Sequence, residues 1–205
     1  MSQTSSIVFA SGNPGKIREV AEIFADLNVT VVPQEQFGFD SPPETGQTFV
    51  DNALLKARYA AVQSGLPALA DDSGIVADAL GGRPGVRSAR YAGEGATDKE
   101  NVDKLLEELV DVPDAQRGGG FHCAAVFVDS DVNVAPLIAQ AVWRGQILRR
   151  RVGTGGFGYD PVFLDPTVGK TGAQMTREEK NAVSHRGKAF RELKSLLLQR
   201  QSPQR

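Results

Sequence analysis

Short apolar runs alternate with longer amphipathic segments through the first part of the chain. Residues 7–10 and 29–32 are apolar runs of strand length. Between them, residues 17–27 place their apolar side chains at a spacing of three and four, which predicts a helix. Residues 48–64 repeat that spacing with a face rich in alanine. The order strand, helix, strand, helix favours a fold in which helices pack on a sheet.

The next apolar run, which begins at Pro67, ends in two adjacent carboxylates, Asp71 and Asp72. Ser73 and Gly74 follow and are predicted to break the strand, with a further strand over residues 75–80. Carboxylates at the end of a strand can be held rigidly and still face solvent, which suits a divalent cation. A polar turn that contains two aspartates is the alternative interpretation.

The second half is predicted to contain more strands. A long loop at residues 81–95 carries three arginines, and the three glycines at 118–120 predict a flexible break. The remaining predicted elements are a helix at 98–110, antiparallel strands at 121–129 and 137–152, a brief strand at 162–163, and helices starting at 176 and covering 188–199. Together the elements predict an α/β or α+β fold with a mixed, twisted sheet and flanking helices. Of the two classes we expect α/β, with two lobes around a cleft.

Length and composition narrow the class of protein. The chain has 205 residues, enough for one domain with a real core, so residues 1–205 are predicted to form a single domain. A net charge of −2 predicts no general attraction to nucleic acid or to acidic membranes. The single cysteine, Cys123, stands among apolar residues and is predicted to be a buried thiol. With no signal peptide and no spanning apolar stretch in the sequence, we expect a cytoplasmic protein.

A glycine-rich turn stands between the first predicted strand and helix. It reads Ser11, Gly12, Asn13, Pro14, Gly15, Lys16. Backbone N–H groups at the start of a helix attract phosphate, and Lys16 adds a positive charge. The spacing is too short for a Walker A loop, and an ordinary strand-to-helix turn is the alternative.

A second glycine-rich segment, residues 153–161, contains the pattern G-x-G-x-x-G. It is not predicted to bind a dinucleotide, because that fingerprint must open a helix and Tyr159, Asp160 and Pro161 cannot continue as one. We expect a loop in which the backbone approaches a ligand and Phe157 or Tyr159 offers an aromatic face to a flat base. A glycine-rich hairpin connection is the alternative.

Charged residues near two helices complete the candidate chemistry. Glu44 precedes the helix at 48–64 and is either a metal ligand or an acid that favours the helix N-terminus. Lys56 lies within that helix and either faces the cleft as a phosphate ligand or is exposed. Lys180, His185 and Arg186 can donate hydrogen bonds to a ligand. The alternative is that they are solvated basic residues near the start of a helix.

Six of these motifs occur in an order that resembles a known family. They are SGNPGK at 11–16, ETGQTFVDNA from Glu44, ADDSG around Asp72, GGRPGVRSARY at 81–91, GTGGFGYDP at 153–161, and SHRGKA from Ser184. The chain closely resembles the inosine triphosphate pyrophosphatases over about residues 8–197. The resemblance implies an elongated α/β fold and hydrolysis of ITP, dITP and XTP to the monophosphate and pyrophosphate.

The resemblance also implies Mg²⁺ as cofactor, a homodimer, and a role for each motif. Glu44 and Asp72 would hold the metal, and Asp72 would also act as the base, although the residues alone leave open how Asp71 and Asp72 divide these roles. The implied nucleotide-binding residues are Ser11, Gly12, Asn13, Pro14, Gly15, Lys16, Lys56, Ser73, Phe157, Gly158, Tyr159, Asp160, Lys180, His185 and Arg186. The rival interpretations are a nucleotide-binding module without activity, an NAD-dependent oxidoreductase and a structural dimerisation protein.

Overall fold

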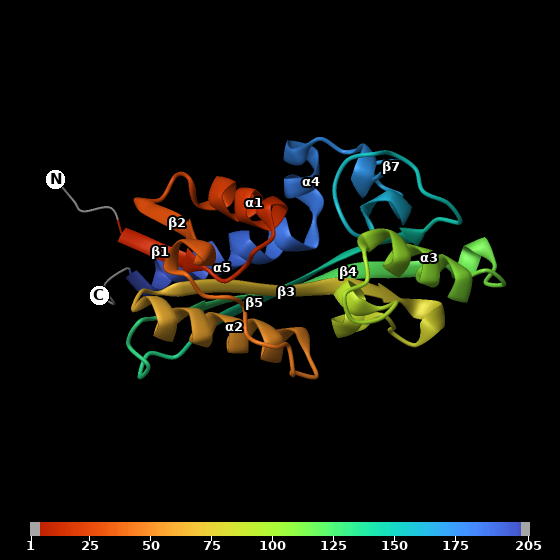
Figure 1. Ribbon diagram of the computed structural model, residues 1–205. Coiled ribbons are helices and arrows are strands. Elements are labelled where there is room, and N and C mark those ends of the chain that lie inside the picture. Colours follow the sequence, from red (N-terminus) through yellow and green to blue (C-terminus); the bar gives the residue numbers. More distant parts are fainter. Residues whose placement is uncertain (1–4, 202–205) are drawn as a thin grey trace. The chain divides into compact units, whose positions relative to one another are not determined.

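The fold is a mixed α/β arrangement built on a seven-stranded sheet, as the sequence predicts (Figure 1). The computed structural model describes residues 5–201. The strands are β1 (Ser5–Phe9), β2 (Val29–Pro33), β3 (Ala68–Ala77), β4 (Gly118–Val128), β5 (Leu137–Ile147), β6 (Phe163–Asp165) and β7 (Lys170–Thr171). The α-helices are α1 (Pro14–Phe24), α2 (Phe49–Ser64), α3 (Asp98–Glu108), α4 (Arg177–Val183) and α5 (His185–Gln201).

The sheet has the strand order β2-β1-β3-β4-β5-β6-β7 and mixes strand directions. β1 pairs in parallel with both β2 and β3, whereas β6 pairs antiparallel with β5 and with β7. The parallel pairs are connected through α1 and α2, as parallel neighbours require a crossover. The predicted mixed sheet with flanking helices is therefore confirmed.

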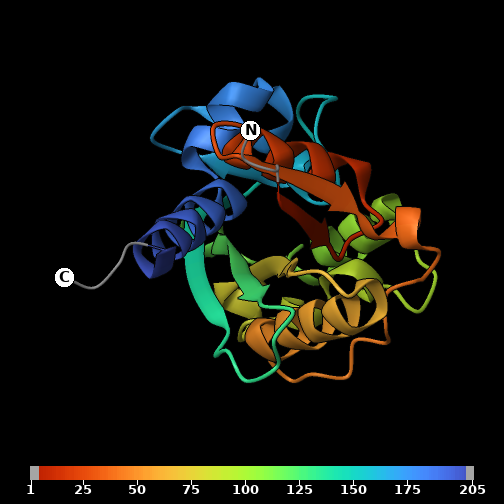
Figure 2. The same ribbon diagram turned by 90° about the vertical axis from the view of Figure 1, so that its left-hand side faces the viewer.

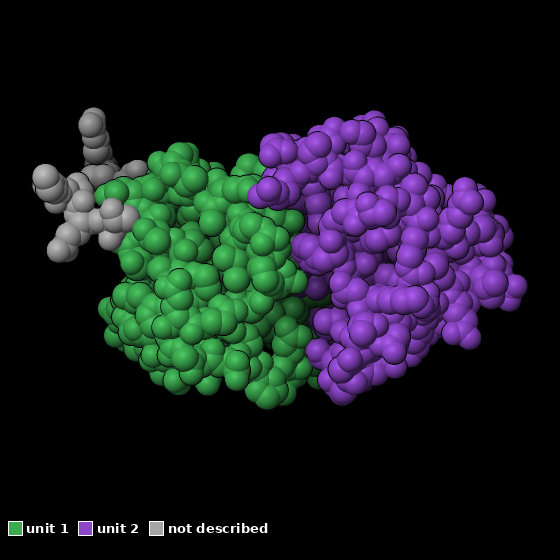
Figure 3. Space-filling model, turned by 45° about the horizontal axis from the view of Figure 1, so that its top comes forward, with its two compact units in different colours: residues 1–72, 123–141, 186–205 green, residues 73–122, 142–185 purple. Residues whose placement is uncertain are grey.

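The chain divides into two compact units, which Figure 3 shows in different colours. Unit 1 comprises residues 1–72, 123–141 and 186–205, and unit 2 comprises residues 73–122 and 142–185. Strands β3, β4 and β5 each contribute residues to both units. That residues 1–205 form a single domain, and that a cleft separates two lobes, stay predictions.

Unit 1 is a three-layer arrangement in which helices cover both faces of the strands. α1 and α5 lie on one face and α2 lies on the other (Figures 1 and 2). Successive strand residues point to opposite faces, and the two buried clusters follow that alternation. Phe9, Leu69 and Cys123 join the α1 and α5 cluster, whereas Ala70 and Ala124 join the α2 cluster.

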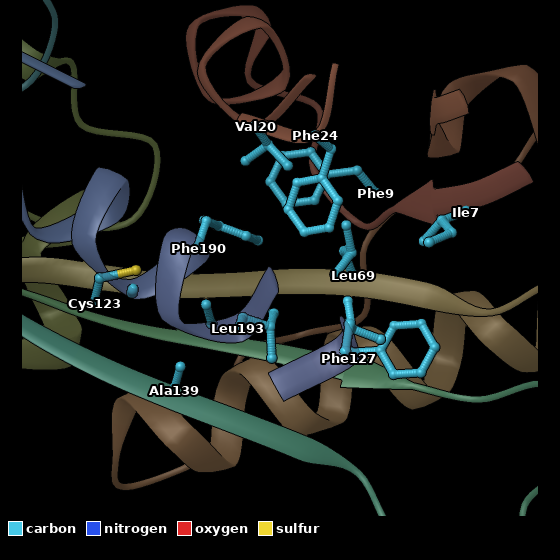
Figure 4. Close-up of a cluster of buried hydrophobic side chains, with 13 residues drawn as sticks. Ile7, Phe9, Val20, Phe24, Leu69, Cys123, Phe127, Ala139, Phe190 and Leu193 are labelled. Atoms are coloured by element: carbon cyan, nitrogen blue, oxygen red, sulfur yellow. The ribbon is translucent and has the colours of Figure 1, made fainter. Parts of the chain in front are cut away.

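Large rings fill the α1 and α5 side of unit 1. Phe190 packs edge-on against Phe9 and Phe24, with ring centroids 5.8 and 6.3 Å apart. Figure 4 shows these three residues in one cluster with Leu69 of β3. Cys123 belongs to this cluster and is 3% exposed, so the predicted buried thiol is confirmed. Burial raises the pKa of this thiol, which makes it a poor nucleophile.

Unit 2 has its own core around α3, the second halves of β3 and β5, and the segment before β6. Trp143 and Phe163 pack at a centroid distance of 4.8 Å, and Phe121 lies against both rings. The indole N–H of Trp143 donates to Asp165 at 2.8 Å, which satisfies its single buried donor. Leu105 and Leu109 complete this core from the α3 side.

Local sequence signals explain where the helices that carry the candidate site begin and end. Asn13 caps α1 through its side chain, and Pro14 occupies the first helical position, which suits its fixed φ. Thr48 and Asp51 form a capping box at the start of α2. Gly65 ends α2 at a φ of +70°, a conformation that glycine adopts without strain.

Two glycine-based predictions are wrong. Ser73 and Gly74 do not break the strand, because β3 continues from Ala68 to Ala77 and the helical turn begins only at Asp78. A Cβ on Gly74 would lie 2.4 Å from the Gly85 carbonyl, so glycine is needed here for close approach and not for a break.

The glycines at 118–120 are likewise the start of β4 and not a flexible break. A Cβ on Gly119 would lie 2.6 Å from the Val76 carbonyl oxygen, so this residue also permits close backbone packing. Other differences concern element boundaries. The helix expected from residue 17 begins at Pro14, the helix expected from 188 begins at His185, and the short strand β7 was not predicted. In the described part of the chain, no helix is long and apolar enough to cross a membrane.

Candidate active site

Asp71 and Asp72 lie in the middle of β3 and not at its end, and they face opposite sides of the strand. Asp71 follows the alternation of Leu69 and faces α1 and α5, whereas Asp72 follows Ala70 and faces α2. Both are almost fully buried, at 1% and 5% exposure. One metal ion held by both aspartates, which the sequence allowed, therefore does not fit this strand.

On the α2 side, Asp72 joins a compact polar cluster. Its Oδ1 is 3.1 Å from the ammonium of Lys56, and its Oδ2 accepts from the Asn52 side chain at 3.1 Å. The same ammonium lies 2.7 Å from Glu44 Oε1. Lys56 is thus buried and faces inward, because it shares one face of α2 with Asn52, one turn away.

The charged groups of this cluster shift the pKa values of one another. Burial raises the pKa of Asp72, and the neighbouring Glu44 adds to that rise while Lys56 opposes it. Burial alone would lower the pKa of Lys56, yet Asp72 and Glu44 raise it above the ordinary value. Lys56 is therefore a cation held between two carboxylates, and Asp72 is an acid whose proton affinity is increased, as suits a general base.

On the opposite face, Asp71 is held between two cations. Lys16 Nζ donates to Asp71 Oδ2 at 3.1 Å, and Arg186 Nε donates to the same oxygen at 3.2 Å. Arg186 Nη1 also donates to Glu19 at 2.7 Å. Burial would raise the pKa of Asp71, but Lys16 and Arg186 outweigh that effect and hold it well below its usual range. Asp71 therefore stays ionised.

The turn from Ser11 to Lys16 has already used part of its hydrogen-bonding capacity. Asn13 Oδ1 accepts from the backbone N–H groups of Gly15 and Lys16, and the N–H of Asn13 donates to Ser11 Oγ. Burial lowers the pKa of Lys16, with Arg186 adding to the effect and Asp71 opposing it. A phosphate at this turn would therefore contact the Lys16 ammonium and those N–H groups that do not already donate within the turn.

Unit 2 gathers a second set of the predicted residues around Asp160, which is 2% exposed. Lys180 Nζ lies 2.5 Å from Asp160 Oδ2 and 4.5 Å from the centre of the Phe157 ring. The N–H of Phe157 donates to the same carboxylate at 2.9 Å. Gly156, at a φ of +71°, is required because a Cβ there would lie 2.2 Å from Asp160 Oδ2. The loop that carries Phe157 is therefore fixed to Asp160.

The aromatic residues of the 153–161 loop are not equivalent. Tyr159 is buried and its hydroxyl donates to the Ser88 carbonyl at 2.8 Å, whereas Phe157 is half-buried. Phe157 is therefore the better candidate for contact with a flat base, with Gly158 beside it. The loop leads into a three-residue helical turn at Asp160–Val162 and then into β6, so it does not open an α-helix as the dinucleotide fingerprint requires.

His185 and Arg186 are adjacent in sequence but contact different groups. The His185 ring stacks on Phe121 at a centroid distance of 4.8 Å and an interplanar angle of 9°. Arg186 is 2% exposed and contacts Asp71 and Glu19, as described above. The predicted site residues thus form two groups: unit 1 holds residues 11–16, Glu44, Lys56, Asp72 and Arg186, and unit 2 holds Ser73, Phe157, Gly158, Tyr159, Asp160, Lys180 and His185.

Sequence reasoning missed two polar residues of these networks, Asn52 and Glu19. Asn52 holds the catalytic candidate Asp72, and its position four residues before Lys56 on an alanine-rich helix face was an available signal. Glu19 is buried at 5% exposure and neutralises Arg186. Its partner is 167 residues away in sequence, so no local pattern points to it.

Carboxylate oxygens at the Lys56 cluster also fit a hard cation. Glu44 and Asp72 both reach one point, since the Lys56 ammonium contacts each of them, and oxygen is the donor type that Mg²⁺ prefers. Among residues 5–201, no group of three or more His, Cys, Asp or Glu side chains is placed to hold a metal ion.

Comparison with known proteins defines the class: the chain belongs to the Ham1 family, whose model matches residues 7–196. The dITP/XTP pyrophosphatase of Shigella flexneri is 55% identical over 185 residues, which cover 90% of this chain and 94% of the relative. The dITP/XTP pyrophosphatase of Escherichia coli K12 is 53% identical over the same coverage.

Solved structures agree with this assignment. A HAM1 protein from Coxiella burnetii matches with a TM-score of 0.87 and 47% identity, covering 95% of this chain and 99% of that protein. A nucleoside-triphosphatase / dITP/XTP pyrophosphatase from Mycobacterium abscessus matches with a TM-score of 0.73 and 41% identity, covering 94% and 98% of the two chains. The family resemblance stated from the motifs is confirmed.

Proposed function

We propose that this protein is a Mg²⁺-dependent pyrophosphohydrolase that converts ITP, dITP and XTP to the monophosphate and pyrophosphate. The observation that carries the proposal is the buried cluster of Asp72, Lys56, Glu44 and Asn52 in a chain of the Ham1 family. Relatives above 50% identity named dITP/XTP pyrophosphatase support the substrate class. We further propose that the protein is cytoplasmic and acts as a homodimer that binds neither nucleic acid nor membrane.

Asp72 is the proposed general base. In the reaction, the oxygen of a water molecule bonds to phosphorus at the α–β linkage, that linkage breaks, and pyrophosphate leaves. The proton of the water passes to Asp72, whose carboxylate is oriented by Asn52 and Lys56.

The other charged residues neutralise and position the triphosphate. Glu44 and Asp72 would hold Mg²⁺, which when bound neutralises phosphate charge and increases the acidity of water. Lys16 and Lys56 supply further positive charge, and preorganised charges of this kind stabilise a transition state without reorganisation. We propose that Ser11 to Lys16 contact the phosphates.

We propose that the purine base contacts the residues gathered around Asp160. Phe157 offers a half-buried ring, and Asp160 and Lys180 hold its loop. Ser73, Gly158, Tyr159, His185 and Arg186 complete the proposed nucleotide-binding set.

A pyrophosphate-release assay over eight nucleotides, with Mg²⁺ and with EDTA, tests this function. We expect release from ITP, dITP and XTP in Mg²⁺, much less from ATP and GTP, and none in EDTA. Binding of ITP without any release would identify a nucleotide-binding module instead. Equal release from all eight nucleotides would remove the proposed substrate class while leaving hydrolysis intact.

A further inference from the structure

A polar cavity in unit 2 is lined by four cationic side chains that the proposed reaction does not use. Its volume is about 350 Å³, and its cations are Arg83, Arg87, Arg90 and Lys104. Arg87 and Arg90 lie in a short 3-10 helix (Gly85–Arg90) where the sequence predicted a loop, Arg83 precedes that helix, and Lys104 comes from α3. The whole chain carries a net charge of −2, so this concentration of positive charge is local.

Hydrogen bonds hold three of the lining residues, Arg83, Tyr91 and Lys104, in place. The Tyr91 hydroxyl donates to Glu108 Oε2 at 2.6 Å, and Arg83 Nη1 donates to the same oxygen at 2.8 Å. Lys104 Nζ donates to the Tyr91 carbonyl at 2.8 Å and lies 4.8 Å from the centre of its ring. Tyr91 is 9% exposed, so two of the four cations are positioned by a buried residue.

Not every cation of the cavity has a carboxylate partner among the described residues. Glu108 is shared between Arg83 and Tyr91, and the Lys104 partner is a neutral carbonyl. Arg90 contacts Glu94 at 3.5 Å, and the Glu94 side chain is 86% exposed. Within residues 5–201, no side-chain partner is found for the Arg87 guanidinium. The cavity therefore keeps positive charge that a bound anion can neutralise.

We propose that this cavity binds diphosphate, either free or as the diphosphate group of a nucleotide. Arginine guanidinium groups present paired donors that match phosphate oxygens, and three of them line one small space. Tyr91 is the one aromatic residue that lines the cavity, and the Lys104 ammonium lies over its ring. A nucleotide base would therefore have to displace Lys104 to stack on that face of the ring. Four cations suit two linked phosphates better than one, because the ligand charge is larger and more extended.

The test is diphosphate binding by the full chain without Mg²⁺, measured by calorimetry and by hydrogen exchange at residues 83–93. The informative variant is Arg87→Glu, and the matched control is Arg150→Glu, an exposed arginine of the same unit. We expect diphosphate to protect residues 83–93 in the parent and in Arg150→Glu. Arg87→Glu should lose that protection and bind at least about tenfold more weakly at this site, as expected for lost charge-assisted hydrogen bonds.

Orthophosphate, sulfate and ADP are the comparison ligands. Stronger protection by diphosphate than by orthophosphate or sulfate supports the proposal, and equal protection by ADP shows that the nucleotide-borne group is accepted. The proposal is overturned if diphosphate leaves residues 83–93 unprotected, if Arg87→Glu binds like Arg150→Glu, or if sulfate protects equally well. Because none of these residues belongs to the proposed catalytic cluster, pyrophosphate release by Arg87→Glu reports on that function separately.

Discussion

Asp71 and Asp72 are neighbours in β3 but have different hydrogen-bond partners on opposite faces of the strand. Asp71 is an ion-pair partner of Lys16 and Arg186, whereas Asp72 contacts Lys56 and Asn52. The pKa of Asp71 is held low and the pKa of Asp72 is raised. The surroundings of Asp71 therefore suit an ion-pair partner, whereas those of Asp72 suit the general base that we propose.

Asp72→Asn is expected to preserve the fold and remove most of the activity. The change keeps the size of the side chain but removes the base, which is worth about 10²–10⁴-fold in rate, and it also removes a proposed metal ligand. Pyrophosphate release from ITP at saturating Mg²⁺ measures the effect. Asp40→Asn, at an exposed aspartate of the same unit, is the matched control and should behave as the parent. Near-normal turnover in Asp72→Asn would assign the base to another residue.

Lys56→Met is expected to bind Mg²⁺ more tightly while losing activity. The Lys56 ammonium occupies the point that Glu44 and Asp72 share, so it competes with a cation for the same oxygens. Removing it leaves two carboxylates that repel each other until a cation binds. Calorimetric titration with Mg²⁺ in the absence of nucleotide measures the affinity, with Lys56→Arg as the charge-conserving control. Unchanged or weaker Mg²⁺ affinity in Lys56→Met would argue against a metal site at these two carboxylates.

Asp71→Asn is expected to destabilise the fold by about 3–5 kcal/mol, because it leaves Arg186 and Lys16 without their shared counter-ion in a buried position. Urea unfolding at neutral pH measures this loss. Glu22→Gln, at an exposed glutamate of α1, is the control. A loss below about 1 kcal/mol, the range of exposed ion pairs, would show that Asp71 is not an essential counter-ion.

The same residue predicts an acid dependence of stability. The folded-state pKa of Asp71 lies below its ordinary value of 3.8. Its contribution is therefore complete above about pH 3.8 and is lost as the pH falls from there toward the depressed pKa. In Asp71→Asn, the free energy of unfolding should fall less steeply over that acid range than in the parent. Parallel curves would assign the acid sensitivity to other carboxylates.

Arg186→Ala is expected to lower kcat/KM for ITP and for ATP by similar factors. The guanidinium contacts Asp71 and Glu19 and is 2% exposed, so its removal disturbs the support of the site for every nucleotide. Stability should fall as well, which urea unfolding measures. A much larger loss for ITP than for ATP would instead show that Arg186 recognises the oxygen at C6 of the base.

Local patterns in the sequence were sufficient to predict the main helices and strands and to indicate the family. The spacing of apolar residues identified α1, α2 and the parallel strands, since the periodicities of 3.6 and 2 reflect backbone geometry directly. The motifs around Lys16, Asp72 and Phe157 also pointed to the candidate site residues, because their order along the chain resembles that of a known family.

The predicted strand breaks at Gly74 and Gly119 are wrong for a physical reason. Gly74 and Gly119 lie inside strands, where the absence of a Cβ allows another backbone segment to approach. A sequence shows that a glycine is present, but it does not show which distant atom lies where a side chain would be. The same residue type therefore predicted a break where the structure has a close contact.

The sequence by itself determined that the chain belongs to this family and which polar residues are candidates for its chemistry. Only the tertiary structure decided how those residues are partnered. Arg186 donates hydrogen bonds to Asp71, which is 115 residues away in the sequence, and to Glu19, which is 167 residues away. Lys56 contacts both Glu44 and Asp72. Ion pairs and pKa values depend on distance in space and on burial, and neither quantity is encoded by spacing along the chain.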